Sequence, residues 1–176
     1  PPADPVDCQA ILDANPNAPT GIHQITPDDG QPFNVFCMMQ NPNDVPGGWT
    51  LVAAASDDNQ DTWTWNNRSL LMESNRTTVG GLAGLSSGGF PAQFNDFRSP
   101  AYYRVSATDL LFVHRPSGQW AQYDDVAGGD VTLGGFVANF SEPQFWSGTD
   151  DGFGLSEGSI TVRENLCSTR LFFSPC

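Results

Sequence analysis

Three oxygen-bearing side chains stand at alternate positions of a short acidic segment: Asp57, Asn59 and Asp61. Short loops that wrap calcium use this spacing, and the ion takes about six to eight oxygen ligands. The segment is not an EF-hand, because Thr62 stands where that loop has glycine and Arg68 where it has a bidentate glutamate. Two interpretations stay open: a calcium loop that other segments complete, or a solvated acidic turn.

Two glycine-flanked serines match the G-x-S-x-G pattern of serine hydrolases, at 84–88 and 154–158. That pattern needs a strand before it, a helix after it and a later histidine, yet no histidine follows Ser156. The adjacent carboxylates Asp124 and Asp125 would suit a glycosidase only if they faced a shared substrate, and neighbouring side chains usually point apart. We therefore expect a non-catalytic protein, with an exported hydrolase as an alternative.

One aromatic side chain is a candidate for stacking on a sugar ring. Trp120 lies in the polar, turn-rich stretch PSGQWAQYDD, so we expect it to be exposed and predict that it contacts ligand. The other aromatic residues are expected mainly in the core. His114, at the end of a predicted strand, is expected to be a hydrogen-bonded structural residue.

The charge balance is strongly acidic. The formal net charge is −13, and all seven cationic side chains are arginine. A surface this negative repels nucleic acid and anionic membranes, so neither is an expected partner, whereas it suits divalent cations. No apolar run reaches the length of a membrane span, so membrane insertion is not expected.

The four cysteines form an N-terminal pair, Cys8 and Cys37, and a C-terminal pair, Cys167 and Cys176. An even count without C-x-x-C spacing favours structural disulfides over a zinc site. Disulfides persist in oxidising compartments, so we expect a secreted, extracellular or cell-surface protein. The Pro-rich residues 1–6 fit a linker that leads into an exported domain.

The elements that must position these residues are short, because 18 glycines and 14 prolines interrupt the chain. A helix is predicted between Asp7, which can cap it, and Asn15, which precedes proline and ends it. Gly47 and Gly48 predict a tight turn before a core tryptophan, Trp49. Further elements are expected as strands at 20–27, 33–37, 49–55, 109–114, 131–140, 158–165 and 168–175, a turn at 28–30 and a short helix at 67–74. Short strands with few helices predict an irregular α+β domain.

Three stretches near the start, DCQAIL, APTGIHQITPDDGQPFNVFCMM and GGWTLV, resemble the opening of fibrinogen-related domains in order and spacing. NDFRSPAYYRVSATDLLFVHRP resembles an intelectin segment in which a proline and a tyrosine pair precede an A-x-D-L strand and a histidine. ITVRENLCSTRLFFSPC is similar to an intelectin stretch that ends in two nearby cysteines. The likeness is closest to the intelectin branch and spans most of the chain.

The resemblance implies a fibrinogen C-terminal-like domain over 7–176, with an N-terminal subregion at 7–55 and the remainder at 56–176. In that family the first cysteine bridges one about thirty residues on, which here pairs Cys8 with Cys37. Closing such a loop stabilises a fold by about 3–4 kcal/mol in the chain-entropy model. Cys167 and Cys176 pair with each other, or with cysteines of a longer relative; both pairings stay open.

The resemblance also implies calcium. Intelectins hold structural calcium with the loop after the G-G-W-T strand and an acid before the paired tyrosines, and that acid maps to Asp96. A late acidic loop of fibrinogen-related domains maps to Asp150 and Asp151, for which a plain acidic turn is the alternative. In intelectins the sugar site follows the last cysteine matched here, so we expect a member shortened at its C-terminus.

These observations predict a secreted, non-catalytic recognition domain that binds a glycan or cell-surface carbohydrate and that calcium stabilises. The alternative is a structural or adhesive module of a larger exported protein, without a sugar site of its own. A homo-oligomer is compatible with either. Asn67, Asn75 and Asn139 each begin a glycosylation acceptor sequence, which matters only in a eukaryotic source.

Overall fold

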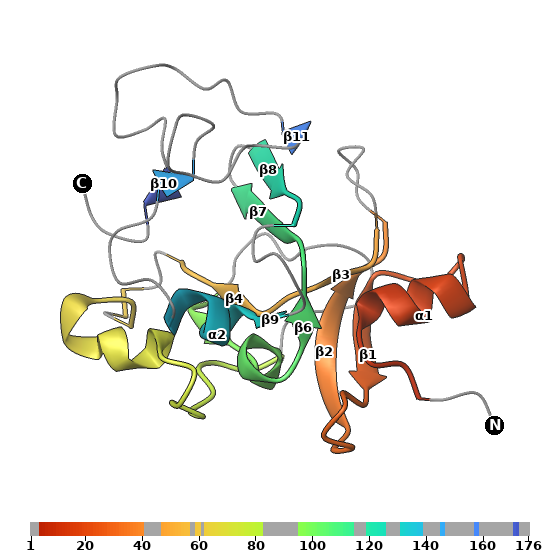
Figure 1. Ribbon diagram of the computed structural model, residues 1–176, viewed down its shortest axis with the longest axis horizontal. Helices are drawn as coiled ribbons and strands as arrows, with labels where there is room; N and C mark the ends of the chain where they lie inside the picture. The colour runs from red at the N-terminus through yellow and green to blue at the C-terminus, as the bar shows by residue number, and fades with distance from the viewer. Residues whose placement is uncertain are drawn as a thin grey trace.

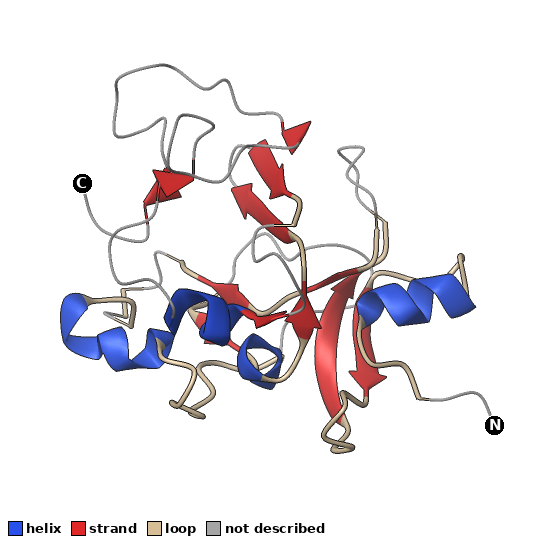
Figure 2. Cartoon of the chain, viewed as in Figure 1, coloured by secondary structure: helices blue, strands red, loops and turns tan. Residues whose placement is uncertain are grey.

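The structure is a computed structural model, and it describes residues 4–40, 47–56, 59–60, 62–82, 95–114, 119–125, 131–138, 145–146, 157–158 and 171–172. The helical elements are α1 (Cys8–Ala14), the 3-10 helices η1 (Trp65–Leu71) and η2 (Pro100–Tyr103), and α2 (Leu133–Ala138). The strands are β1 (Gly21–Ile25), β2 (Phe33–Met38), β3 (Trp49–Thr50), β4 (Ala53–Ala54), β5 (Phe97–Arg98), β6 (Ser106–Ala107), β7 (Leu110–His114), β8 (Gln119–Tyr123), β9 (Val131–Thr132), β10 (Phe145–Trp146), β11 (Glu157–Gly158) and β12 (Leu171–Phe172). Their described pairings are all antiparallel, so the predicted irregular α+β class is confirmed (Figures 1 and 2).

The predicted N-terminal helix and hairpin are confirmed. The Asp7 carboxylate caps α1 by accepting a 2.7 Å hydrogen bond from the Ala10 amide, and the helix ends before Asn15. Strands β1 and β2 pair from Gly21 opposite Cys37 to Ile25 opposite Phe33. Gly30 closes the turn between them at φ +70°, a left-handed conformation that favours glycine.

The predicted bridge between Cys8 and Cys37 is present and ties α1 to β2. The half-cystines lie in a fully buried core that also contains Ile25 and Val35 from the hairpin. Ala101 and Val105, from η2 and the residues after it, complete the same core. Because these residues are buried together, the hairpin is packed against η2 and the segment that follows it.

The segment predicted as one strand over 49–55 forms two short strands in different sheets, so that prediction was wrong. β3 extends the β1–β2 sheet, with Trp49 opposite Met38, whereas β4 pairs with β5. The chain passes from one sheet to the other because its peptide groups change partner. The Leu51 amide donates to the Phe36 carbonyl, while the Val52 carbonyl accepts from the Ser99 amide. Gly48 makes the predicted turn at φ +94°, but Trp49 is only partly buried.

The strand predicted over 131–140 was also wrong: of its described residues, 131–138, Val131–Thr132 is extended and the rest form α2. Leu133, Phe136 and Val137 have the i, i+3, i+4 spacing of a helical face, and they pack together in a second core. The Thr132 hydroxyl accepts a 3.0 Å hydrogen bond from the Gly135 amide and so satisfies one amide of the first turn.

The second core lies between α2 and the sheet of β7, β8 and β11. The predicted strand at 109–114 is confirmed as β7, and Phe112 meets Tyr123 of β8 edge-on with ring centroids 6.0 Å apart. The predicted helix at 67–74 is present as η1, starting two residues earlier. Of the predicted strand at 168–175, the described part is β12, which pairs with β10.

Candidate functional site

Asp96 lies beside the segment that follows the G-G-W-T strand. The residue is 4% exposed, and Oδ1 accepts hydrogen bonds from the Ser56 amide at 2.8 Å and from the Ser56 hydroxyl at 3.5 Å. The antiparallel pairing of β4 with β5 brings the two residues together, since Ala54 lies opposite Phe97. The expected approach of Asp96 to this segment is therefore present, whereas calcium binding stays a prediction.

The other predicted calcium ligands fall mostly outside the described residues: Asp57, Asp61, Asp150 and Asp151. Asn59 is described, is exposed, and has a left-handed backbone at φ +59°, which asparagine tolerates in tight loops. Within the ranges that the structure describes, no three His, Cys, Asp or Glu side chains gather where they could hold a metal ion. The disulfide partners proposed near the C-terminus, Cys167 and Cys176, also lie outside those ranges.

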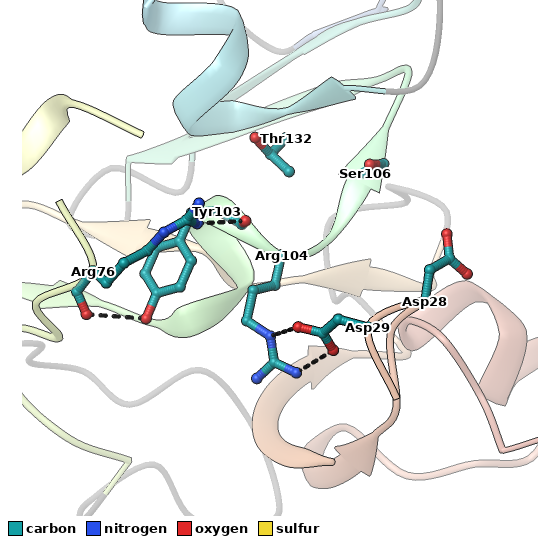
Figure 3. A pocket seen from close by; sticks show the side chains of 7 residues that line it. All are labelled: Asp28, Asp29, Arg76, Tyr103, Arg104, Ser106 and Thr132. Carbon is teal, nitrogen blue, oxygen red and sulfur yellow. Dashed lines mark hydrogen bonds and ion pairs between the residues drawn. The ribbon is translucent and has the colours of Figure 1, made fainter. Parts of the chain in front are cut away.

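A polar pocket of about 450 Å³ opens between the β1–β2 turn and η2 (Figure 3). Its lining comes from that turn, the segment after η1, the end of η2, and strands β6 and β9. Each of the lining side chains that the structure describes carries a hydroxyl, carboxylate or guanidinium group: Asp28, Asp29, Arg76, Tyr103, Arg104, Ser106 and Thr132. The pocket thus combines hydrogen-bond donors and acceptors, which suits a ligand rich in hydroxyl groups.

The pocket lining contains an ion pair between Asp29 of the hairpin turn and Arg104 at the end of η2. Arg104 Nε donates to Asp29 Oδ2 at 2.7 Å, and Nη2 donates to Oδ1 and to the Gln31 carbonyl. The guanidinium also lies 4.3 Å from the centroid of the Phe33 ring. The hydrogen bonds from Arg104, and next the one from the Gln31 amide, hold the pKa of Asp29 below its usual value. This pair links the N-terminal hairpin to the rest of the pocket.

Arg76 lies across the ring of Tyr103 at one side of the pocket. Its guanidinium carbon is 4.5 Å from the ring centroid, a cation–π geometry. Arg76 Nη1 donates to the Tyr103 carbonyl at 2.9 Å, and the Tyr103 hydroxyl donates to the Arg76 carbonyl at 3.1 Å. These reciprocal hydrogen bonds hold the Arg76 side chain in place, although the residue itself is exposed.

Arg98 is fully buried and hydrogen-bonds the segment that carries Arg76. Its guanidinium donates to three backbone carbonyls, those of Thr77 and Asn75 at 2.7 Å and that of Met72 at 3.2 Å. It also lies 4.4 Å from the Tyr102 ring centroid. Burial lowers the pKa of Arg98, and its Nε has no hydrogen-bond partner in the described part of the chain.

Tyr102 completes this support from the η2 side. Its hydroxyl donates to the Leu71 carbonyl at 2.9 Å, and its ring packs so closely on Gly134 that a side chain there would lie 3.0 Å from the ring. Burial raises the pKa of Tyr102 to about 12, against the opposing effect of the Arg98 charge. The tyrosine therefore stays neutral, and α2, η1 and η2 are joined at one point.

The remaining candidate residues lie away from the pocket lining. Trp120 is in β8 opposite Val113 and is partly buried, so it is less exposed than expected, while its contact with ligand stays a prediction. Asp124 accepts a hydrogen bond from the Gln122 side chain, and the Asp125 amide donates to Asp109. The serines of both G-x-S-x-G matches lie outside the described residues.

No family model matches the chain, so the resemblance to fibrinogen-related domains stays a prediction. None of the helices in the described ranges is long and apolar enough to cross a membrane.

Sequence reasoning missed the pocket because its described lining residues come from five separate segments. One signal was available: Arg76, Arg98 and Arg104 are cations in a chain of net charge −13, and such rare charges have specific partners.

Proposed function

We propose that this protein is a non-catalytic recognition domain that binds carbohydrate in the pocket between the hairpin turn and η2. The disulfide between Cys8 and Cys37 supports a setting outside the reducing cytosol. We place the protein in the secreted or cell-surface compartment, where glycans are abundant. The proposal rests chiefly on the pocket lining.

The lining supports a sugar ligand because its described side chains carry polar groups and because several of them are held in position. Sugar hydroxyls need both donors and acceptors, which guanidinium, hydroxyl and carboxylate groups provide in fixed positions. The ion pair of Arg104 with Asp29 and the stacking of Arg76 on Tyr103 restrict these side chains before a ligand arrives. Less conformational entropy is then lost when the ligand binds.

Blocking the pocket tests this proposal on a glycan array. Ser106 lines the pocket, is exposed, and its hydroxyl makes no hydrogen bond in the described part of the chain. We expect Ser106→Phe to fill the pocket and abolish glycan binding without unfolding the domain. Ser69→Phe, on the exposed surface of η1, is the matched control and should bind like the wild type. Absence of glycan binding by the folded wild type would refute the proposal.

We also propose that calcium stabilises the segment after the G-G-W-T strand, with Asp96 among its ligands. The buried Asp96 carboxylate beside Ser56 supports this assignment. Millimolar calcium should raise the melting temperature of the wild type, and Asp96→Asn should remove the increase. The calcium proposal fails if the wild type melts at the same temperature with calcium and with chelator.

The competing function is an adhesive module that has no sugar site of its own. It would place the binding surface on another part of a larger exported protein. A correctly folded domain, with the disulfide intact and no glycan bound on the array, would favour this alternative. Turnover of a chromogenic ester or glycoside would instead favour a hydrolase.

A further inference from the structure

We propose that Arg76 makes the pocket selective for sugars that carry a carboxylate, such as uronic acids, an inference that rests on the carbohydrate-binding function proposed above. The argument starts from the charges of the lining. Among the lining residues that the structure describes, four are of acidic or basic type: Asp28, Asp29, Arg76 and Arg104. Their partners determine which of them remain available to a ligand.

Two of the four charges neutralise one another. Arg104 and Asp29 form a bidentate pair, with a further hydrogen bond from Arg104 to the Gln31 carbonyl. A ligand carboxylate would have to displace Asp29 from this geometry to reach Arg104. Arg104 is therefore a poor site for a second anion, and Asp29 is not a strong acceptor for ligand hydroxyls.

Arg76 is the cation that remains. Within the part of the chain that the structure describes, no carboxylate lies within salt-bridge distance of its guanidinium. One of its five N–H donors bonds the Tyr103 carbonyl through Nη1, which leaves Nε and Nη2 for a ligand. Two parallel N–H groups of an arginine match the two oxygens of a carboxylate, and such bidentate hydrogen bonds are stronger than neutral ones.

Arg76 is also held in position before binding. Its guanidinium is held by the contact with the Tyr103 ring and by the hydrogen bond from Nη1 to the Tyr103 carbonyl, and Arg98 binds the carbonyls of Asn75 and Thr77, the residues before and after it. A lysine on the same backbone would keep the charge but lose the planar fork. Because the N–H groups on Nε and Nη2 of Arg76 are held parallel, they can bond both oxygens of a carboxylate at once, which a hydroxyl group does not allow.

Asp28 determines the orientation in which the sugar binds. In Figure 3 it stands on the opposite side of the Arg104–Asp29 pair from Arg76. Its exposed carboxylate can accept hydrogen bonds from sugar hydroxyls and repels a second anion. The carboxylate end of the sugar is thus assigned to Arg76, and its hydroxyl-bearing end to Asp28.

The net charge of −13 affects the rates at which a carboxylate-bearing sugar associates with the pocket and dissociates from it. Long-range repulsion slows the approach of any anion, whereas close contact with Arg76 slows its departure. We therefore expect selectivity for the acid to lie in a slower dissociation rate rather than in faster association. Added salt should speed association of the acid by screening the repulsion.

The test uses a galacturonic acid trisaccharide and its methyl ester, which differ only at their carboxyl groups: esterification removes the negative charges and leaves every hydroxyl group unchanged. By calorimetry and surface binding kinetics, the wild type should bind the acid about tenfold more tightly than the ester, the effect of charge-assisted hydrogen bonds that water partly screens. Arg76→Gln should bind acid and ester alike, and Arg76→Lys should keep only part of the preference. Arg68→Gln, which removes the same charge from exposed η1, should keep all of it.

Sialic acids carry the same chemistry, so a sialylated trisaccharide and its methyl ester form a second arm that distinguishes the two sources. Equal affinity for acid and ester in both arms, or a preference that persists in Arg76→Gln, would overturn the inference. If each acid and its ester bind with equal affinity, the proposed carbohydrate-binding function survives while the inference about Arg76 fails. If no sugar binds at all, both fail. The wild-type comparison decides the matter even if Arg76→Gln does not fold.

Discussion

Replacing the buried Arg98 with methionine should destabilise the fold by about 3 kcal/mol. The side chain is similar in length, but it cannot donate to the three carbonyls of Met72, Asn75 and Thr77. A hydrogen bond to a charged group contributes about 1.5–3 kcal/mol, and an unpaired buried carbonyl costs about 1–3 kcal/mol. We take about 1 kcal/mol for each bond, because Met72 and Thr77 are exposed and water can replace part of what is lost.

Urea unfolding measures this loss. The midpoint should fall while the slope with denaturant is unchanged, and the melting temperature should fall by about 6–12 °C for a chain of this size. Arg98→Lys should lie between Arg98→Met and the wild type, since it keeps a charge but has no planar fork. Arg68→Met, on the exposed face of η1, should change stability by less than about 0.5 kcal/mol. If Arg98→Met unfolds within about 1 kcal/mol of the wild type, Arg98 does not fasten the 72–77 segment.

Three further predictions concern the disulfide and two titrating groups. Replacing Cys8 and Cys37 together with serine should cost about 3–4 kcal/mol in urea unfolding, since the bridge closes a loop over a sequence separation of 29; a loss below about 1 kcal/mol would contradict the chain-entropy argument. Because the folded pKa of Asp29 is lowered, its ion pair stabilises the fold above the ordinary value of 3.8 and is lost as pH falls through the lower folded value. Asp29→Asn should therefore be less stable than Asp28→Asn at pH 7, and this difference should shrink as the pH falls below 3.8; a difference that is unchanged by pH would count against the pair. Since the folded pKa of Tyr102 is raised to about 12, neutral Tyr102 stabilises the fold fully below pH 10 and loses this contribution as pH rises through the folded value. Burial also raises the pKa of Tyr123, so ultraviolet titration should show late ionisation of both tyrosines, and Tyr102→Phe should reduce its amplitude; an unchanged amplitude in that variant would refute the assignment.

Local signals predicted the N-terminal part of the fold well. Asp7 and Asn15 bound α1, Gly30 closes the hairpin, and β2 includes the predicted Phe33, Val35 and Cys37, although its burial is continuous from Val35 onward rather than alternating. These features depend on neighbours a few residues apart, which a single sequence displays. The pairing of Cys8 with Cys37 came from a family resemblance and is present in the structure.

Features that depend on distant partners were predicted less well. The apolar run 49–55 shows no sign of the change of sheet between β3 and β4, because the exchange depends on Phe36 and Ser99. The segment 131–140 was predicted to be extended, although Leu133, Phe136 and Val137 have helical spacing. In both segments tertiary contacts outweighed local propensity.

In the candidate site, too, one feature was predicted from the sequence and another was not. Asp96 was predicted beside the acidic segment and is found next to Ser56. The pocket was not predicted, because Arg76, Arg104 and Asp29 come together only through the packing of the hairpin on η2. A sequence shows that arginines are rare in an acidic chain, but not which of them share a pocket.

The central claim, that carbohydrate binds in this pocket, is tested most directly by nuclear magnetic resonance. Amide spectra of the isotope-labelled protein would be recorded while a glycan selected on the array is added. We predict that the largest shift changes occur at the amides of the lining residues Tyr103, Arg104, Ser106 and Thr132. Shift changes centred on Trp120 or on another surface, with these four amides unmoved, would contradict the claim.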